Sequence, residues 1–253
     1  RATLDGMLKY KRSHTEACRT GEDKFFYDAD APLVDWVCQG ADDSRPSFEC
    51  QIMDWSDDIA YSVHDVEDGM WAGLISAPRL RRKQTREAVL AAVPSASTED
   101  FAAVCEELQA VLAVEGDRTA KAARKTWSSW AIYEMVHAAG AQPASDGGRG
   151  RRYSRRLVVE PSVRTKSRLL KAIAEELVFH HRSVAGVRER AGMVVRSLFA
   201  AVIDGGLDEF LPADVRDQLR RPGEDHLRVA CDYIAGMTDD YAMRMHRRIT
   251  ARR

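Results

Sequence analysis

One segment near the start of the chain, residues 46–71, separates apolar from acidic side chains at the period of an α-helix. The large apolar residues recur every three or four positions, and they are Ile52, Trp55, Ile59, Val63, Val66 and Met70. This spacing places them along one side of a helix, so we expect a long helix with the stripe buried. The other segments of the chain are interpreted around this helix.

The opposite side of the expected helix is acidic and has no basic partner within the same segment. It carries Asp54, Asp57, Asp58, Tyr61, His64, Asp65 and Asp68. Between Pro46 and Pro78 the sequence holds seven acids and no Lys or Arg. Carboxylates that lack partners repel one another unless a cation, or basic groups from elsewhere in the chain, lies over them. Two interpretations stay open here, a metal-carrying wall beside a phosphate-bearing ligand or a solvated acidic face.

Two blocks of sequence resemble the deoxynucleoside triphosphate triphosphohydrolases, a family of HD-domain phosphohydrolases that includes the bacterial dGTPases. Residues 57–68, DDIAYSVHDVED, resemble the last motif of that family. Residues 231–239, CDYIAGMTD, resemble its closing helix. The opening ATLDGMLKY and the KFFY run at 24–27 are also similar to family segments. The resemblance extends to about Ile249 and is weak between about Arg79 and Arg155.

The resemblance implies a site for a divalent metal on the acidic helix. The family holds its metal with a His, an adjacent His-Asp pair and a later Asp, and the later Asp corresponds to Asp57. Asp58 is expected to support the site without binding the metal. The ligand chemistry suits Mg or Mn first, and Fe, Co or Ni as well. The literal pair His64-Asp65 lies on the wrong helix to be the metal-binding pair, so His64 is interpreted as a polar residue at the edge of the site.

The remaining metal ligands, and the family's catalytic His and Glu, are expected upstream of Arg1. No catalytic residue is therefore expected in this chain, which resembles the C-terminal part of the family and should be inactive alone. The other histidines that we considered as ligands lack a partnered carboxylate at ligand spacing and are interpreted as surface or cap residues, namely His180, His181 and His246.

The resemblance also implies a substrate site for a deoxynucleoside triphosphate. Lys9 and Lys24 are expected to reach the phosphates, which suits a point charge on a flexible stem, although solvated surface lysines remain the alternative. Tyr61 is expected to pack against the sugar, and Asp65 to accept a hydrogen bond from the 3′-OH. Tyr61 lies one helical turn beyond Asp57 and Asp65 lies two turns beyond it, so the three residues share one face.

The sequence predicts an all-α fold, an HD-domain-like helical bundle with a C-terminal helical extension and at most a short β-hairpin. We expect an HD-domain portion over 1–75, a helical C-terminal region over 76–253, and a flexible loop at about 141–152. Residues 153–160 favour a strand or hairpin arm. The run from Tyr10 to Gly21 is expected to be a loop. Further helices are expected over 2–10, 32–39, 117–139, 163–181, 184–204 and 224–249. Another helix is expected to begin at residues 97–100, which place acids in its first turn.

Several of these helices carry residues that we expect to be buried. In the helix expected over 117–139 they are Trp127, Trp130, Ile132, Tyr133 and Val136. In the helix over 184–204 they are Val187, Ala191, Val194, Val195, Leu198 and Val202. In the helix over 224–249 they are Leu227, Ala230, Cys231, Ile234 and Met237.

Composition narrows the class of protein. A net charge of −1 argues against a general nucleic-acid binder. The five cysteines show no CxxC spacing, so neither a zinc knuckle nor a disulfide framework is indicated, and this is typical of a protein in a reducing cytoplasm. No apolar run is long enough to span a bilayer, so we expect a cytoplasmic protein without a signal peptide or membrane contact. The basic run Arg149–Arg156 favours either an anion or single-stranded nucleic-acid contact, or a mobile solubilising loop.

The function implied by the resemblance is metal-dependent hydrolysis of a deoxynucleoside triphosphate to deoxynucleoside and triphosphate, by a homo-oligomer of four or six subunits. The alternative is a regulatory module that binds nucleotide or single-stranded nucleic acid. A third interpretation is a helical scaffold that oligomerises through its C-terminal helix.

Overall fold

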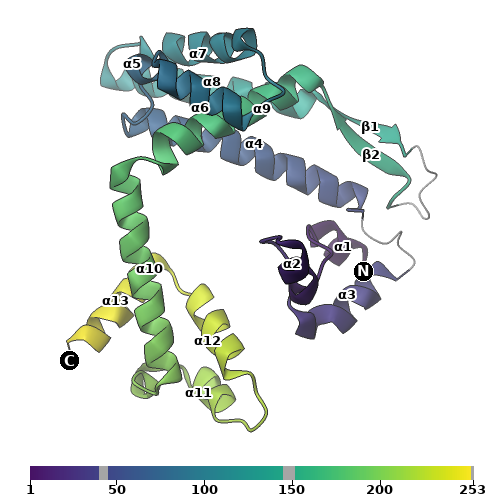
Figure 1. The fold of residues 1–253 in the computed structure, drawn as a ribbon, viewed down its shortest axis with the longest axis vertical. Helices are drawn as coiled ribbons and strands as arrows, with labels where there is room; N and C mark the ends of the chain where they lie inside the picture. Colours follow the sequence, from purple (N-terminus) through teal and green to yellow (C-terminus); the bar gives the residue numbers. More distant parts are fainter. Residues whose placement is uncertain (40–44, 145–151, 252–253) are drawn as a thin grey trace. The chain divides into compact units, whose positions relative to one another are not determined.

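The computed structural model describes residues 1–39, 45–144 and 152–251, and almost all of its regular structure is helical (Figure 1). The predicted all-α fold class is confirmed. The first helices are α1 (Ala2–Met7), α2 (His14–Thr20), α3 (Ala31–Cys38), α4 (Phe48–Trp71), α5 (Ala77–Leu80), α6 (Lys83–Ala92), α7 (Thr98–Leu112), α8 (Asp117–His137) and α9 (Pro161–Ala174). The last ones are α10 (Arg182–Ile203), α11 (Ala213–Leu219), α12 (His226–Ala235) and α13 (Asp239–Thr250). Short 3-10 turns cover Asp28–Asp30 and Asp208–Phe210, and a π-turn, Glu175–Phe179, follows α9.

The described chain divides into two compact units, residues 1–180 and 181–253, and each unit has its own hydrophobic core. The boundary that we expect near residue 75 rests on the family resemblance and stays a prediction. The first unit contains the acidic helix and every residue expected at the site.

Helix α4 is the central element of the first unit, as the apolar stripe predicts. Ser47 caps it, because the Ser47 side chain accepts a hydrogen bond from the amide of Cys50. The stripe is buried from Trp55 to Met70, whereas Ile52 is 42% exposed and does not belong to it. The Trp55 indole donates a hydrogen bond to the Met135 carbonyl at 3.1 Å, which fixes α4 against α8.

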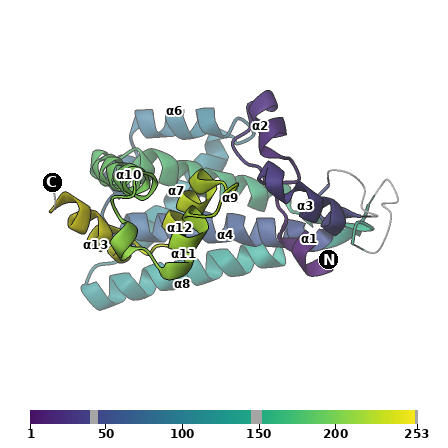
Figure 2. The ribbon, with the colours of Figure 1, turned by 90° about the horizontal axis from the view of Figure 1, so that it is seen from below.

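Helices α8 and α9 both pack along α4, and α6 and α7 pack on α9 (Figure 2). Helix α7 begins as the sequence predicts, because Ser97 and Asp100 form a reciprocal capping box. The aromatic residues of α8 only partly follow the prediction. Trp127 is buried, but Trp130, Tyr133 and Val136 are 65%, 53% and 51% exposed. They lie on the side of α8 that faces away from α4, so the prediction of a buried aromatic face is wrong for them.

The N-terminal segment contains a helix that the sequence analysis missed. The run to Gly21 was expected to be a loop, but residues 14–20 form α2. Ser13 and Glu16 form a capping box at its start, and Gly21 ends it with φ 72°. Helix α3 lies where the sequence predicts it, at Ala31–Cys38. The missed signal is local, since a Ser followed three residues later by Glu is a helix start.

The hairpin is antiparallel and consists of β1 (Ala139–Pro143) and β2 (Arg155–Val159). Its register pairs Ala139 with Val159 and Pro143 with Arg155. The arm predicted at 153–160 is confirmed. The loop predicted at 141–152 starts too early, because Ala141 to Pro143 belong to β1, and its stretch from 145 to 151 lies outside the described residues.

The second unit is helical, but its last predicted helix is two helices. Gly236 ends α12, and the Thr238 side chain caps α13 by accepting a hydrogen bond from the Tyr241 amide. Helix α10 agrees with the prediction in extent. Of its expected stripe, Val194, Leu198 and Val202 are buried, whereas Val187 and Val195 are exposed. On α12, Leu227 is exposed too. Among the described residues, no helix combines the length and the apolar character needed to cross a membrane.

Candidate functional site

Lysines from three other segments lie over the carboxylates of α4. Their ion pairs join Lys9 with Asp54 and Asp57, Lys171 of α9 with Asp58, and Lys125 of α8 with Glu67. Helix α4 offers these acids no basic residue of its own, so the tertiary structure supplies the counter-charges. These pairs also show how the acidic helix can pack inside a unit without strong repulsion between its carboxylates.

Lys9 lies at the end of the opening segment and contacts the residue predicted as the metal ligand. Its ammonium group is 2.5 Å from the Asp54 carboxylate and 3.0 Å from the Asp57 carboxylate. Partial burial lowers the pKa of Lys9, but hydrogen bonds to Asp54 and Asp57 outweigh burial and hold the pKa above its usual range. Lys9 is therefore a fixed cation beside Asp57.

Lys24 approaches the same place from the segment after α2. Its ammonium group lies 5.1 Å from the centre of the Tyr10 ring, and that of Lys9 lies 5.8 Å from the same ring. Interaction with the Tyr10 side chain raises the pKa of Lys24, and the charge of Asp57 contributes in the same direction. The structure thus brings Lys9, Lys24 and Asp57 together, although they are far apart in the sequence.

Asp58 points toward a different partner from its neighbour Asp57. Its carboxylate pairs with the Lys171 ammonium group of α9, and both side chains are about one-third exposed, at 33% and 36%. Adjacent residues on a helix differ in direction, so one carboxylate faces the lysines of the N-terminal segment and the other faces α9. Asp58 therefore ties α4 to α9. Sequence reasoning did not find Lys171, but the lack of a basic residue on α4 was a signal that such a partner exists.

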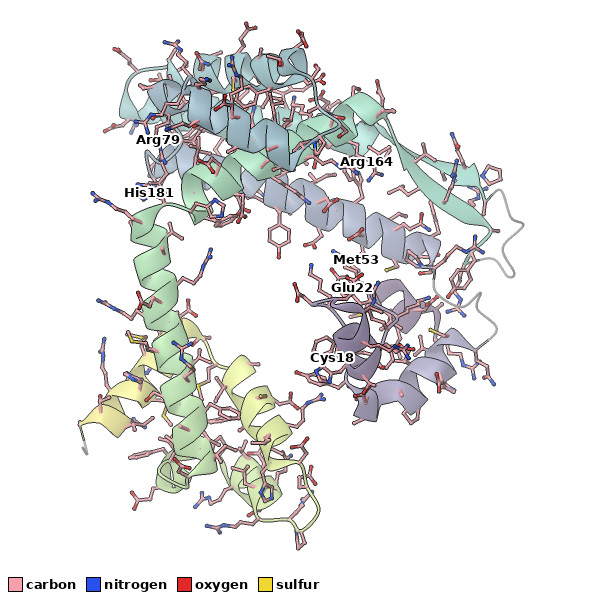
Figure 3. All side chains as sticks on the ribbon, viewed as in Figure 1. Cys18, Glu22, Met53, Arg79, Arg164 and His181 are labelled. Atoms are coloured by element: carbon pink, nitrogen blue, oxygen red, sulfur yellow. The ribbon has the colours of Figure 1, made fainter. Side chains whose placement is uncertain are left out.

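Tyr61 and Asp65 continue the Asp57 face toward the C-terminus of α4. Met53, which is labelled in Figure 3, lies one turn before Asp57 on that face. The Tyr61 side chain is 57% exposed, so its ring is available for contact with a ligand. Burial raises the pKa of Asp65, and Asp68 raises it further, while Lys171 and His64 act in the opposite direction.

Within the described ranges, no group of three or more His, Cys, Asp or Glu side chains is arranged to hold a metal ion. The carboxylate of Asp57 can supply one oxygen ligand to a divalent metal. Asp54 is a second carboxylate nearby, since Lys9 pairs with both residues. Imidazole ligands do not accompany them among these residues. The described chain can therefore supply part of a metal site.

The other histidines lie at the edge of the acidic face or near the start of α10. His64 lies 4.0 Å from Glu67 and is exposed, which fits a residue at the edge of the acidic face. His181 caps α10, as expected, because its ring accepts from the Ser183 amide. His180 is exposed, and its ring lies 3.3 Å from Glu175 and 3.6 Å from Glu176.

Comparison with known proteins gives one family model and a consistent set of relatives. Residues 157–248 match the model described as a phosphohydrolase-associated domain. A deoxyguanosinetriphosphate triphosphohydrolase-like protein of Streptomyces coelicolor is 35% identical over 99% of this chain and 62% of its own length. A protein of the same name from Corynebacterium efficiens is 33% identical over 98% of this chain and 62% of its own length.

The chain is similar to this family of triphosphohydrolase-like proteins over nearly all of its own length. A Corynebacterium glutamicum member is 53% identical over 76 residues, which are 30% of this chain and 18% of that protein. The family resemblance expected from residues 57–68 and 231–239 is thus confirmed. The chain spans 62% of the length of the Streptomyces and Corynebacterium efficiens relatives. The matched associated domain starts in β2 and includes Lys171, the partner of Asp58.

Proposed function

We propose that the protein containing this chain hydrolyses a deoxynucleoside triphosphate, such as dGTP, to the deoxynucleoside and inorganic triphosphate. The observation that carries the proposal is that Lys9 and Lys24 lie near the same Tyr10 ring while Lys9 pairs with Asp57. A triphosphate is a compact polyanion, and two cations beside a carboxylate that can bind a metal form a suitable environment for it. The names of the relatives agree with this substrate class.

In the proposed reaction, the oxygen of a water molecule bonds to the α-phosphorus. The bond between that phosphorus and the 5′-oxygen breaks, and the 5′-oxygen takes up a proton. A bound divalent metal, with Mg or Mn as the first choice, would polarise a phosphate oxygen and lower the pKa of water. Asp57 would supply one oxygen ligand to this metal.

The other residues of this chain would bind and orient the substrate. Lys9 and Lys24 would neutralise the negative charge of the triphosphate while the 5′-oxygen of the deoxynucleoside leaves. The exposed ring of Tyr61 would pack against the deoxyribose, and Asp65 would accept a hydrogen bond from the 3′-OH. Asp58 would keep α4 in place through Lys171 without touching the substrate.

Turnover of dGTP by the full-length protein, with Mn or Mg, tests this proposal. Asp57→Ala should lower turnover by about a hundredfold or more, because it removes a metal ligand. Lys9→Met should lower it by about a hundredfold, because it removes a cation that stabilises the transition state. Asp68→Asn is the matched control, since it removes an exposed carboxylate from the same helix and should have little effect.

The products identify the reaction. Ion-exchange chromatography should show deoxyguanosine and triphosphate in equal amounts. Pyrophosphate and dGMP would contradict the proposed bond cleavage. Full activity in Asp57→Ala would contradict the assigned role of Asp57.

A second candidate function, a regulatory module that binds nucleotide or single-stranded nucleic acid, is supported by exposed arginines on β2. Nucleotide binding without turnover in the full-length protein would favour it. Assembly into tetramers or hexamers and a cytoplasmic location are compatible with both functions and remain predictions.

A further inference from the structure

A basic pocket lies where the start of α4 meets the hairpin. Its volume is about 340 Å³, and its lining includes Arg45, Arg155, Arg156, Gln51 and Tyr153. Among the residues that the structure describes, the lining holds three arginines and no carboxylate. Arg155 and Arg156 are exposed, and within the described ranges neither forms an ion pair with an acid. Their guanidinium groups are thus available to a ligand.

The floor of the pocket is a rigid network beneath Tyr153, which is only 4% exposed. The Tyr153 hydroxyl donates to the Asp5 carboxylate at 2.7 Å and accepts from the Lys11 ammonium group at 3.0 Å. Asp5 also forms ion pairs with Lys11 at 2.7 Å and with Arg152 at 3.0 Å. One buried carboxylate faces two cations here, so the network leaves a positive charge beneath the pocket.

Gln51 holds the wall of the pocket together. Its side-chain oxygen accepts from the Leu157 amide of β2 at 2.9 Å, and its side-chain nitrogen donates to the Pro46 carbonyl at 3.2 Å. The hairpin and the start of α4 are therefore held in a fixed relation. A site built on such fixed elements presents its charges without a large ordering cost when a ligand binds.

The shape of the pocket selects among anions. A single nucleic-acid strand needs a groove that follows several nucleotides and aromatic faces on which bases stack. The aromatic residue of this lining is Tyr153, whose ring is buried and flanked by Lys11 and Arg152, with cation to ring-centre distances of 5.0 Å and 5.7 Å. It offers no free face to a base. A compact phosphate group fits better, because guanidinium groups bind phosphate oxygens in pairs.

We propose that the pocket formed by Arg155, Arg156, Arg45 and Gln51 is a second anion site, which binds an oligophosphate group. The ligand is either inorganic triphosphate or the phosphate moiety of a nucleotide. The site is separate from the cluster at Asp57, because Gln51 lies more than one helical turn before Asp57 and Lys11, rather than Lys9, lies under the pocket. The proposal does not depend on the proposed function, since it concerns binding alone.

Isothermal titration calorimetry of sodium triphosphate into the full-length protein, in 50 mM salt without added metal, tests the site. The double variant Arg155→Gln/Arg156→Gln should bind triphosphate at least about tenfold more weakly at one site, because two charged hydrogen-bond donors are lost. The matched control is Arg118→Gln/Lys121→Gln, which removes two exposed cations from α8 and should leave affinity unchanged. Lys24→Gln, at the Asp57 cluster, should leave this site occupied.

The sources of the phosphate are distinguished by parallel titrations with dGTP and deoxyguanosine. Binding of triphosphate and dGTP without binding of deoxyguanosine supports an oligophosphate site, and tighter binding of dGTP assigns the ligand to a nucleotide. Unchanged triphosphate affinity in the Arg155/Arg156 variant would overturn the proposal. Equal losses in the control variant would overturn it as well, since the effect would then be one of net charge. Binding of a single-stranded oligonucleotide but not of triphosphate, lost in the Arg155/Arg156 variant, would assign the pocket to nucleic acid instead.

Discussion

Gly69 lies in the last two turns of α4, where the helix comes closest to its neighbours. A Cβ atom added at Gly69 would be 2.7 Å from Val178 Cγ2 and 2.8 Å and 2.9 Å from Ile75 side-chain carbons. Both neighbours are β-branched, and Ile75 is fully buried, so neither side chain can retreat without moving others. Gly69→Ala should therefore force the core apart.

Two opposing effects decide the magnitude of this change. Replacing Gly by Ala inside a helix stabilises it by about 1 kcal/mol. Overpacking a well-filled core costs about 1–3 kcal/mol, and three contacts below 3.0 Å favour the upper half of that range. We expect a net loss of roughly 1–2 kcal/mol in the free energy of unfolding of the first unit.

Urea unfolding followed by tryptophan fluorescence measures this loss. All five tryptophans lie within residues 1–180, so fluorescence follows the first unit while circular dichroism follows both. The control is Gly186→Ala in α10, where an added Cβ meets nothing within 4 Å. It should stabilise α10 by about 0.5–1 kcal/mol and leave the fluorescence transition unchanged. A Gly69→Ala protein as stable as the wild type would refute the reasoning, because helix propensity and not close packing would then decide the outcome.

Two further predictions concern the buried ion pair below the arginine pocket. Asp5→Asn should lower the free energy of unfolding by about 3–5 kcal/mol, because Lys11 is only 4% exposed and would lose its counter-charge. The control is Glu87→Gln, which breaks the exposed pair with Lys83. It should change the free energy of unfolding by less than about 0.5 kcal/mol in the same urea titration. Stability should also fall as pH rises above 10.5, the ordinary pKa of lysine. Burial lowers the pKa of Lys11, but hydrogen bonds to Asp5 and Tyr153 outweigh burial, so the pKa in the folded protein is above 10.5. The stabilisation from charged Lys11 is therefore complete below pH 10.5 and is lost as the pH rises through the pKa of the folded protein. Burial raises the pKa of Tyr153, so ionisation of this residue at high pH also lowers the stability of the folded protein. Equal urea midpoints at pH 9 and pH 11 would contradict this assignment.

Local periodicity was sufficient to predict most of the fold. The all-α class, the extent of α4, the helix start at Ser97 and the arm at 153–160 all depend on neighbouring residues, and the structure agrees with each. The failures were local as well in two places, at Ser13, where a capping box was overlooked, and at Gly236, where one helix was expected instead of two.

Burial was predicted less well than helix formation. An apolar period shows that residues share a face, but it does not show how much of that face a neighbour covers. Trp130 and Tyr133 share α8 with the buried Trp127, and Val187 shares α10 with the buried Val194. In each case helical spacing was correct, and the tertiary packing left part of the face in solvent.

The sequence by itself determined that α4 would form, that one side of it would be acidic, and that residues 57–68 resemble a triphosphohydrolase motif. Only the tertiary structure decided which cation meets which carboxylate. Lys9 and Lys171 lie far from Asp57 and Asp58 in the chain, and an ion pair between distant residues leaves no period or spacing in the sequence. The same holds for the arginine pocket, because Arg45 and the arginines of β2 come together only when β2 packs against the start of α4 in the folded chain.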